Sequence, residues 1–180
     1  MFRRLTSLAL FGLFSLVMPA TAARAQETPD ADPADVESLD GLIHALYDVI
    51  SGDAGVARDW DRMRSLFIPG ARLIPSGTNP QGQFGHRVMT LEEWISGAES
   101  SFAQRPFYEK EIGRRTDEWG SLVQMFSAYD SRTSPDAEPF ARGINSIQAM
   151  HDGERWWIVT IYWTAERDDL PLPDEYVGSN

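Results

Sequence analysis

The sequence predicts an α+β fold, with helices in its first half packed on an antiparallel sheet formed by its second half. Apolar residues recur with a helical period in three segments before residue 103, and the pattern changes to four extended runs after it. Asp152–Gly153, a strong hairpin-turn signal, joins the last two runs. A chain of 180 residues is long enough to form one such domain with a substantial core.

The three predicted helices lie within residues 39–52, 56–67 and 90–102. In the first two, apolar residues three and four positions apart form one face, and glycine or proline follows the last of them. The third helix begins with a capping box, because Thr90 is followed three residues later by Glu93. A short strand follows the second helix, and a loop rich in glycine, asparagine and glutamine leads to the third.

The four extended runs cover residues 107–115, 119–132, 143–151 and 155–166. In the last run, "RWWIVTIYWTAE", both alternate sets of side chains are largely apolar, so both faces of this strand should be covered. A second subunit or a terminal segment of the same chain could supply the outer cover. Residues 167–180 are polar, which favours a homodimer formed through Trp157, Ile161 and Trp163.

The first 25 residues have the pattern of a secretory signal peptide. Arg3 and Arg4 precede a short apolar run, and Ala23-Arg24-Ala25 matches a cleavage site. The mature chain would then begin near Gln26 and be periplasmic or secreted. The rest divides into a flexible acidic leader, a folded domain and a polar tail, at residues 26–38, 39–166 and 167–180.

The chain is acidic, with 27 Asp and Glu against 16 Lys and Arg and a formal net charge of −11. Loss of the three arginines within residues 1–25 makes the charge −14. Phosphate backbones and anionic lipids repel such a protein, so we expect no nucleic-acid partner and no membrane partner after signal cleavage. The sequence contains no cysteine, so the fold must rely on its core rather than on disulfides.

The order of these elements resembles the nuclear transport factor 2-like, SnoaL-like family of cone folds. The resemblance rests on "WDRMRSLFIPGARL", "FYEKEIGRRTDEWGSLVQMFSAYDSR" and "GINSIQAMHDGERWWIVTIYW", and it extends over about residues 39–166. It implies that a curved antiparallel sheet encloses a pocket closed by the N-terminal helices, and that the outer sheet face often packs on a second subunit. Its members include isomerases, cyclases, dehydratases, hydrolases and proteins with no known reaction, so the resemblance does not define a function.

Strand alternation predicts which side chains face that pocket. With a two-residue turn at Asp152–Gly153, His151 pairs with Glu154 and Asn145 lies opposite Thr160. Extended across the sheet, this alternation gives an apolar inner face with a few hydrogen-bonding groups, as small-molecule sites have. The predicted ligand-binding residues are Glu111, Ser127, Tyr129, Asn145 and Tyr162. A register shifted by one residue would instead select Gln124, Gln148 and Trp163.

Three residues are candidates for catalysis. Glu109 and Glu111 lie two apart on one strand, so their carboxylates project to the same side. Buried together, one of them would have a raised pKa and could act as an acid or a base. Salt bridges on a solvated strand face are the commoner reason for such a pair. His86 lies in a loop that could overhang the pocket, either as a base or as an ordinary surface residue.

The sequence predicts neither a cofactor nor a metal. His44 and Asp48 are one helical turn apart, but two ligands are too few for a metal site. The glycine-rich loop at residues 76–85 lacks the lysine and the strand–loop–helix context of a phosphate-binding loop.

Three functions stay open on the sequence alone. The chain could be an exported protein that binds a small, partly apolar molecule without turning it over. It could be an isomerase, dehydratase or cyclase with a pocket glutamate as general base. It could also be a dimeric interaction module whose cone is filled by large side chains such as Met125, Ile147 and Trp156.

Overall fold

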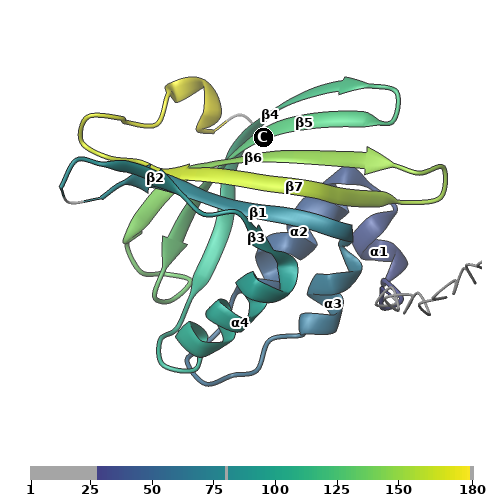
Figure 1. Ribbon diagram of the computed structural model, residues 1–180, viewed down its shortest axis with the longest axis horizontal. Helices are drawn as coiled ribbons and strands as arrows, with labels where there is room; N and C mark the ends of the chain where they lie inside the picture. The colour runs from purple at the N-terminus through teal and green to yellow at the C-terminus, as the bar shows by residue number, and fades with distance from the viewer. Residues whose placement is uncertain (1–27, 80, 179–180) are drawn as a thin grey trace, which may run out of the picture.

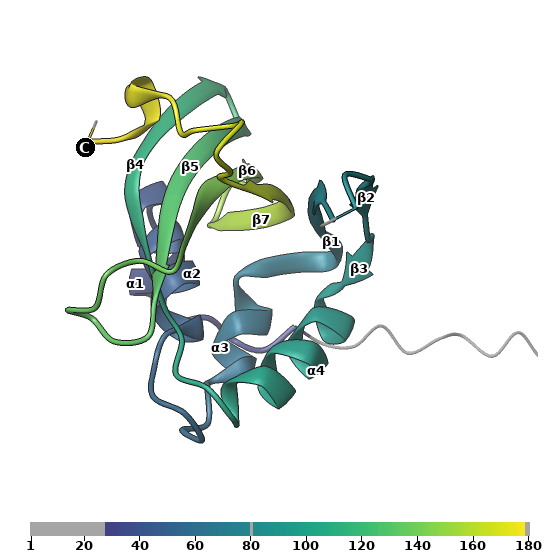
Figure 2. The same cartoon turned by 90° about the vertical axis from the view of Figure 1, so that its left-hand side faces the viewer.

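The computed structural model describes residues 28–79 and 81–178, which form helices packed against one face of a curved sheet (Figure 1, Figure 2). The helices are α1 (Pro33–Val36), α2 (Leu39–Ile50), α3 (Trp60–Ser65), α4 (Leu91–Phe102) and the short 3-10 helix η1 (Asp174–Tyr176). The strands are β1 (Phe67–Thr78), β2 (Phe84–His86), β3 (Met89–Thr90), β4 (Tyr108–Trp119), β5 (Leu122–Arg132), β6 (Ala141–His151) and β7 (Trp156–Ala165). The predicted α+β fold is confirmed, while the predicted signal peptide lies outside the described residues.

Side-chain caps determine where the helices begin. Ser38 precedes α2 and accepts a hydrogen bond from the backbone N–H of Gly41 at 3.0 Å. The predicted capping box at α4 is confirmed, because Thr90 Oγ1 accepts from the N–H of Glu93 and the Glu93 carboxylate accepts from the N–H of Thr90. These bonds satisfy N–H groups that have no partner inside the helix.

The strands form one open sheet in the order β2-β1-β7-β6-β5-β4, with β3 paired to β1. Strands β4 to β7 form the predicted antiparallel meander. The sheet as a whole is mixed rather than fully antiparallel, because β1 runs parallel to β7. Figure 2 shows the sheet curving over the helices, which lie on its concave side.

The core fills one end of the space between the helices and the sheet. Met125 and Ile147, which the sequence suggested as cone-filling residues, pair across β5 and β6 and are fully buried. Leu42, Ile43 and Ile158 are buried in the same core. Burial of a side chain of this size stabilises a fold by about 1.5–3 kcal/mol. Only this end of the cone is filled, and the opposite end is left for the cavity described below.

The hairpin between β6 and β7 differs from the predicted two-residue turn. His151 pairs with Trp156 instead of Glu154, because four residues connect the strands. Asp152 stabilises this longer turn, since its Oδ1 accepts from the backbone N–H groups of Glu154 and Arg155, both at 2.9 Å. A bulge at Val159 then shifts the pairing once more.

These two shifts change the partner of every residue further along β7. Asn145 lies opposite Trp163 rather than Thr160, and Ile147 lies opposite Ile161. The inward face of this part of β7 is therefore the set that the predicted register had placed outside.

A terminal segment of the chain covers part of the outer sheet face. Tyr176 in η1 packs edge-on against Phe126 of β5, with ring centroids 5.7 Å apart. The N–H of Gly178 donates to the carbonyl of Ile112 at 3.0 Å. Gly113 has no side chain at the point where the backbone of Tyr176 approaches β4 most closely. The C-terminal tail thus covers part of β4 and β5, rather than β7, the strand whose outer cover the sequence left open.

The outer face of β7 does not consist of the residues that were expected to form the homodimer contact. Ile161 and Trp163 point inward, because the bulge reverses their direction. Trp157 is covered within the chain by the guanidinium of Arg155, 3.7 Å from its ring centroid. The homodimer stays a prediction, and these two inward residues cannot be its contacts.

The start of the described chain also departs from the expected flexible leader. Residues 33–36 form α1, whose Val36 is buried in the core. Asp35 receives two hydrogen bonds from the guanidinium of Arg62, at 2.7 and 2.9 Å. One apolar anchor and one ion pair therefore order the last part of the acidic segment. Within the described residues, the longest helices have 12 residues, and none is long and apolar enough to cross a membrane.

Candidate functional site

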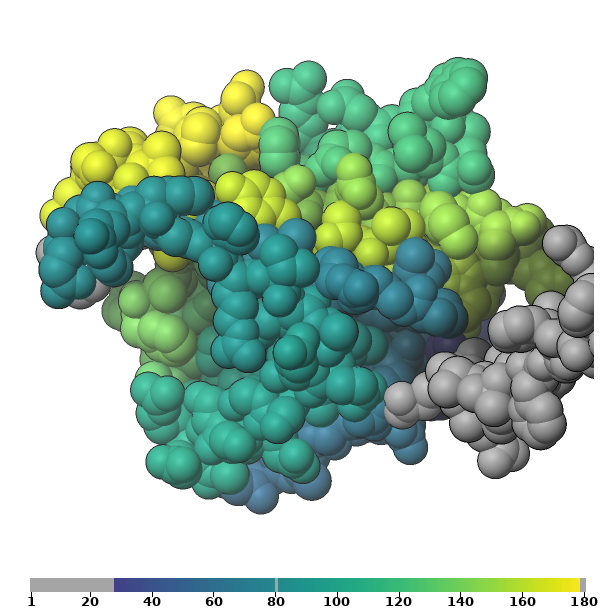
Figure 3. Space-filling model, in the orientation of Figure 1, coloured from purple at the N-terminus to yellow at the C-terminus, as the bar shows by residue number. Residues whose placement is uncertain are grey.

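A cavity of about 360 Å³ lies between the helices and the inner sheet face. Figure 3 shows the molecular surface hollowed beneath the β1–β2 hairpin, on the side of α4. The volume is near the lower limit of ligand pockets, which hold roughly 300–1,000 Å³. Most of the lining is apolar and comes from helices as well as strands. Its apolar side chains are Leu46, Ile50, Met63, Leu73, Met89, Trp94, Ala98, Phe102, Phe107, Ile161 and Trp163.

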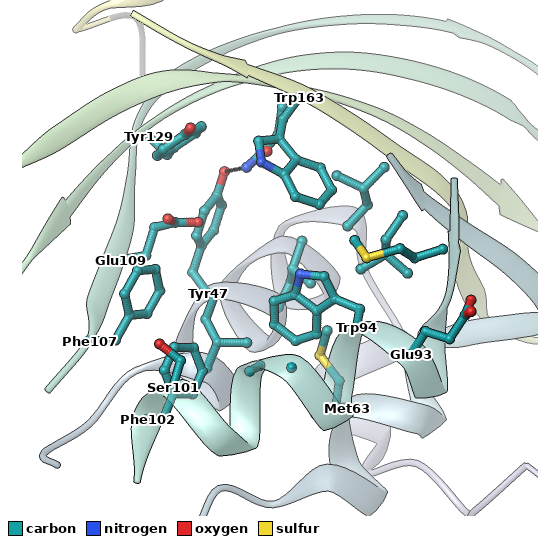
Figure 4. A pocket seen from close by; sticks show the side chains of 18 of the residues that line it. Tyr47, Met63, Glu93, Trp94, Ser101, Phe102, Phe107, Glu109, Tyr129 and Trp163 are labelled. Atoms are coloured by element: carbon teal, nitrogen blue, oxygen red, sulfur yellow. Dashed lines mark hydrogen bonds between the residues drawn. The ribbon is translucent and has the colours of Figure 1, made fainter. Parts of the chain in front are cut away.

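Aromatic rings form the wall of the cavity on the helix side (Figure 4). Phe102 of α4 stacks on Phe107 with ring centroids 4.9 Å apart, and it stacks on Trp60 at 6.3 Å. Trp94 meets the ring of Trp60 edge-on at 6.3 Å. Offset and edge-on arrangements of this kind are the favourable ones for aromatic rings. The wall is therefore held in place from behind by its own aromatic contacts.

Arg58 supports the same wall from the loop after α2. The side chain is buried, and its guanidinium carbon lies 5.1 Å from the ring centroid of Phe102. The guanidinium also donates four hydrogen bonds of 2.6–3.1 Å, to the carbonyl oxygens of Ile50, Gly52, Asp53 and Val56. A buried cation is costly unless hydrogen bonds compensate it, and these carbonyls supply that compensation.

Polar groups gather at the inner end of the cavity, which we define by Tyr47, Glu109, Tyr129 and Asn145 (Figure 4). Asn145 Nδ2 donates to the hydroxyl of Tyr47 at 3.0 Å, and that hydroxyl lies 2.7 Å from Ser127 Oγ. Ser127 in turn donates to Glu111 Oε1 at 2.6 Å. The chain of bonds runs from the cavity along the inner face of the sheet to Glu111. Burial raises the pKa of Tyr47 above its usual range, so this hydroxyl stays protonated.

Two polar atoms at the inner end remain available to a ligand. Among the described residues, neither Asn145 Oδ1 nor the hydroxyl of Tyr129 has a hydrogen-bond partner, and both residues line the cavity. Gly143 makes room for Tyr129, because a Cβ at this position would lie 2.5 Å from the tyrosine oxygen. Buried polar groups are normally paired, so an acceptor and a donor open to the cavity suit a ligand or ordered water.

Glu109 is the ionisable group at this end of the cavity. Ser131 Oγ donates to Glu109 Oε2 at 2.7 Å, and the side chain of Glu109 is partly buried. Burial raises the pKa of Glu109 to about 7, and the nearby charge of Asp130 adds to the rise. Near neutral pH this carboxyl is therefore present in both its protonated and its ionised form.

The sequence predicted that the carboxylates of Glu109 and Glu111 project to the same side of their strand and form a pair. In the structure they share that side but do not form a pair. Both lie on the inner side of β4, but they take different partners: Glu109 lines the cavity, whereas Glu111 binds Ser127 and lies 3.6 Å from Arg114. The neighbour whose charge raises the pKa of Glu109 is Asp130 rather than Glu111. The sequence tied a raised pKa to burial of the two glutamates together, whereas the pKa of Glu109 is raised by its own burial and by Asp130.

The other predicted ligand-binding residues divide into three groups. Tyr129 and Asn145 line the cavity, while Ser127 and Glu111 lie behind it in the hydrogen-bond chain. Tyr162 does not reach the cavity, because its side chain is on the outer face and 43% exposed. The cause is the register of β7, which brings Trp163 opposite Asn145. The alternative register had included Trp163, but its companions Gln124 and Gln148 lie on the outer face, where Gln124 donates to Ser146.

His86 is also outside the cavity. It lies on the short edge strand β2, pairs with Ser76 and is exposed. The nearby residue that does line the cavity is Arg87, one position further on. Sequence reasoning selected the histidine because of its chemistry and had no means of distinguishing two neighbouring loop residues by direction.

Sequence reasoning did not assign the helix residues to the cavity: Trp94 was a possible stacking partner for a ligand, but its spacing favoured the core. Trp94 and Phe102 have the helical spacing of core residues. The aromatic wall to which they belong lies between the core and the cavity. Tyr47 was missed although its apolar neighbours in α2 were identified. A tyrosine on the buried face of an amphipathic helix, whose hydroxyl needs a partner, was the available signal.

The described residues contain no group of three or more metal-ligating side chains. Asp48, the suggested companion of His44, instead accepts a hydrogen bond from Arg62 at 2.6 Å.

Comparison with solved structures identifies the type of fold. A protein of unknown function with a cystatin-like fold from Nostoc punctiforme is 11% identical, with a TM-score of 0.51 over 71% of this chain and 87% of that chain. An NTF-2-like protein of unknown function from Silicibacter pomeroyi is 13% identical, with a TM-score of 0.49 over 72% of this chain and 94% of that one. No protein-family model matches the sequence, and no curated protein does.

The helices on a curved, unclosed mixed sheet form the α+β cone fold that the sequence predicted, and this fold is similar to the cystatin-like fold of the Nostoc punctiforme protein. At 11% identity the likeness concerns the fold alone. The function must therefore be argued from the cavity.

Proposed function

We propose that this protein binds a small, largely apolar molecule in the cone cavity. The observation that carries the proposal is the division of the lining into an aromatic wall and a polar inner end. Ligand sites have this composition, with apolar walls that supply affinity and a few polar groups that fix orientation. At the inner end, the hydroxyl of Tyr129 can donate and Asn145 Oδ1 can accept. A hydroxyl on the ligand would satisfy both, whereas a carbonyl would accept from Tyr129 alone.

Gly97 offers a way to close the cavity without disturbing the fold. It lies in α4, lines the cavity and is exposed, and a Cβ built on it meets no atom within 4 Å. Gly97→Phe should therefore place a ring in open space at the cavity entrance. Replacing a helical glycine also removes a penalty of about 1 kcal/mol relative to alanine, so the fold should not be weakened.

We expect the wild-type protein to bind the fluorescent probe N-phenyl-1-naphthylamine, and Gly97→Phe to weaken this binding by at least about tenfold, or 1.4 kcal/mol. Fluorescence titration measures the affinity, and urea denaturation checks the fold. Gly97→Ala is the matched control, since it makes the same backbone change without the ring and should bind as the wild type does. Equal affinity of all three proteins would contradict binding in this cavity.

A second candidate function is proton transfer by Glu109 on a bound carbonyl compound. The observation that favours it is a partly buried cavity carboxyl whose pKa is about 7, which is suited to a general base near neutral pH. Oε1 of Glu109 has no hydrogen-bond partner among the described residues and can receive a proton. In this reaction Glu109 would remove a proton from the carbon next to the carbonyl. Tyr129 would donate to the oxygen that becomes negative.

Hydrogen exchange of a simple ketone tests this candidate separately from binding. We expect the protein to accelerate exchange of the α-hydrogens of 2-indanone in D₂O, followed by NMR, with a rate that rises with pH through about 7. Glu109→Gln should abolish the acceleration, while the affinity for N-phenyl-1-naphthylamine should persist. Exchange that is equal with wild type, variant and buffer would leave the protein as a binding protein without this reaction.

A further inference from the structure

The ionisable side chains around the cavity include only one cation among the described residues. Arg87, Glu93 and Glu109 are the arginine and the two carboxylic acids of the lining. Figure 4 shows Glu93 and Glu109 on opposite sides of the cavity. Arg87 and Glu93 are both exposed, and together with Gly97 they define what we call the mouth. The cavity therefore has a buried hydrogen-bonding end and a charged, open end.

The two charges at the mouth differ in how far they are already engaged. Glu93 is held by the N-terminus of α4, because its Oε2 accepts from the N–H and the hydroxyl of Thr90, at 2.8 and 3.0 Å. These bonds also lower the pKa of Glu93, so it remains ionised and bound to the cap. Arg87 is anchored only by its backbone, whose N–H donates to the carbonyl of Pro75 at 3.1 Å.

The guanidinium of Arg87 makes no hydrogen bond or contact ion pair with any other described residue, although its charge acts on Glu93 at longer range and helps to lower the pKa of that carboxyl. Most other arginines near the helices behave differently: Arg58, Arg62 and Arg64 are all occupied by carbonyl or carboxylate oxygens. A guanidinium carries five N–H donors in a planar fork that matches a carboxylate, phosphate or sulfonate. At the mouth of an apolar cavity, such a fork could pair with the charged end of a ligand whose apolar part lies inside.

We infer that the ligand is an amphipathic organic anion, whose apolar body occupies the aromatic part of the cavity and whose anionic group lies at the mouth beside Arg87. This inference rests on the proposed binding function and adds the chemical class of the ligand. The rest of the chain is acidic, with a formal net charge of −11, and would by itself repel an anion. A preference for an anion must therefore come from a local cation, and Arg87 is in the position to provide it.

A matched pair of fluorescent probes tests the inference. The probes are 8-anilinonaphthalene-1-sulfonate and N-phenyl-1-naphthylamine, which share one aromatic body and differ in the sulfonate. We expect the wild-type protein to bind the sulfonate about two- to fivefold more tightly than the neutral probe at low salt, as one exposed ion pair provides. The preference should fall as salt screens the pair.

Arg87→Gln should reverse this preference, because only the acidic surroundings then act on the sulfonate, while affinity for the neutral probe stays unchanged. Arg87→Lys should keep the anion preference in part. Arg115→Gln is the control: it removes the same charge from an exposed position on β4, outside the cavity lining. It should leave both affinities as they are.

The two possible failures can be told apart. If both probes bind equally to the wild type and to Arg87→Gln, and Gly97→Phe blocks both, the inferred anion is wrong and the binding function stands. If neither probe binds, or if Gly97→Phe blocks neither, the binding function fails and the inferred ligand class fails with it.

Discussion

Replacing Glu109 by glutamine is expected to make the protein more stable at pH 8 and to leave its stability unchanged at pH 4. The pKa of Glu109 is raised from 4.5 to about 7 in the folded protein, so the folded state holds this proton more tightly than the unfolded chain does. The stabilising contribution is complete below about pH 4.5 and is lost as the pH rises through about 7. A shift of this size corresponds to about 3 kcal/mol between the two ends of the range.

Urea denaturation between pH 4 and pH 8 measures this difference directly. Glutamine resembles the protonated acid and can keep the hydrogen bond to Ser131. The free energy of unfolding of Glu109→Gln should therefore lack the pH-dependent contribution that Glu109 makes in the wild type. Glu92→Gln is a control of opposite sign, because Arg64 lowers the pKa of Glu92 and its contribution is lost as the pH falls. A constant difference between wild type and Glu109→Gln over the whole range would show that Glu109 does not titrate near neutrality.

Replacing Arg58 by methionine is expected to destabilise the protein by about 3 kcal/mol, although the volume of the side chain is largely kept. Four carbonyl oxygens would each lose the guanidinium donor, and only those of Gly52 and Asp53 would keep a backbone donor, from Phe107 and Val56. The loop between α2 and α3 would also lose the group that closes it. Gly52 makes room for this guanidinium, since a Cβ at Gly52 would lie 2.8 Å from it. Because Arg58 also lies over Phe102, affinity for a cavity ligand should fall together with stability.

The midpoint of urea unfolding measures the loss of stability, and probe titration well below that midpoint measures the effect on the cavity. Arg58→Lys separates charge from geometry: it keeps the cation but cannot reach four carbonyls, so most of the loss should remain. Arg105→Met is the surface control, since this exposed arginine donates only to Ser101 Oγ and should change stability by less than about 0.5 kcal/mol. If Arg58→Met lost as little stability as the Arg105→Met control, this would mean that water replaces the guanidinium at little energetic cost.

The fold was predictable because its main signals are local. The spacing in residues 39–52 fixed α2, the capping box at Thr90 fixed the start of α4, and the extended runs became β4 to β7. The parallel pair of β1 with β7 was not predictable in this way, since its partners are separated by about 90 residues and no local pattern records them. The covering of β4 by the C-terminal tail depends on similar long-range contacts at Gly113.

The residues of the candidate site were predictable only where the side chains of a strand alternate regularly between the two faces of the sheet. Tyr129, Asn145 and the glutamates of β4 were assigned to the inner face, and they do lie there. Tyr162 was assigned wrongly because a bulge adds one residue to β7 and so reverses the faces beyond it, while the longer turn stabilised by Asp152 changes the partners but not the faces. Neither event leaves a mark in the pattern of apolar residues, since both alternate sets of this strand are apolar.

The bulge at Val159 has a consequence for the way the shape of the cavity is encoded. A bulge bends its strand and increases the local twist. It does so through one extra residue, which stands outside the alternation of side chains between the two faces of the sheet. Loss of Val159 alone would leave Ile158, Ile161 and Trp163 facing inward but would straighten the strand that carries them. The width of the cone therefore depends in part on the number of residues in β7. In distant proteins of this architecture, a gap of one residue within a strand would alter the volume enclosed even where every side chain around it stayed the same.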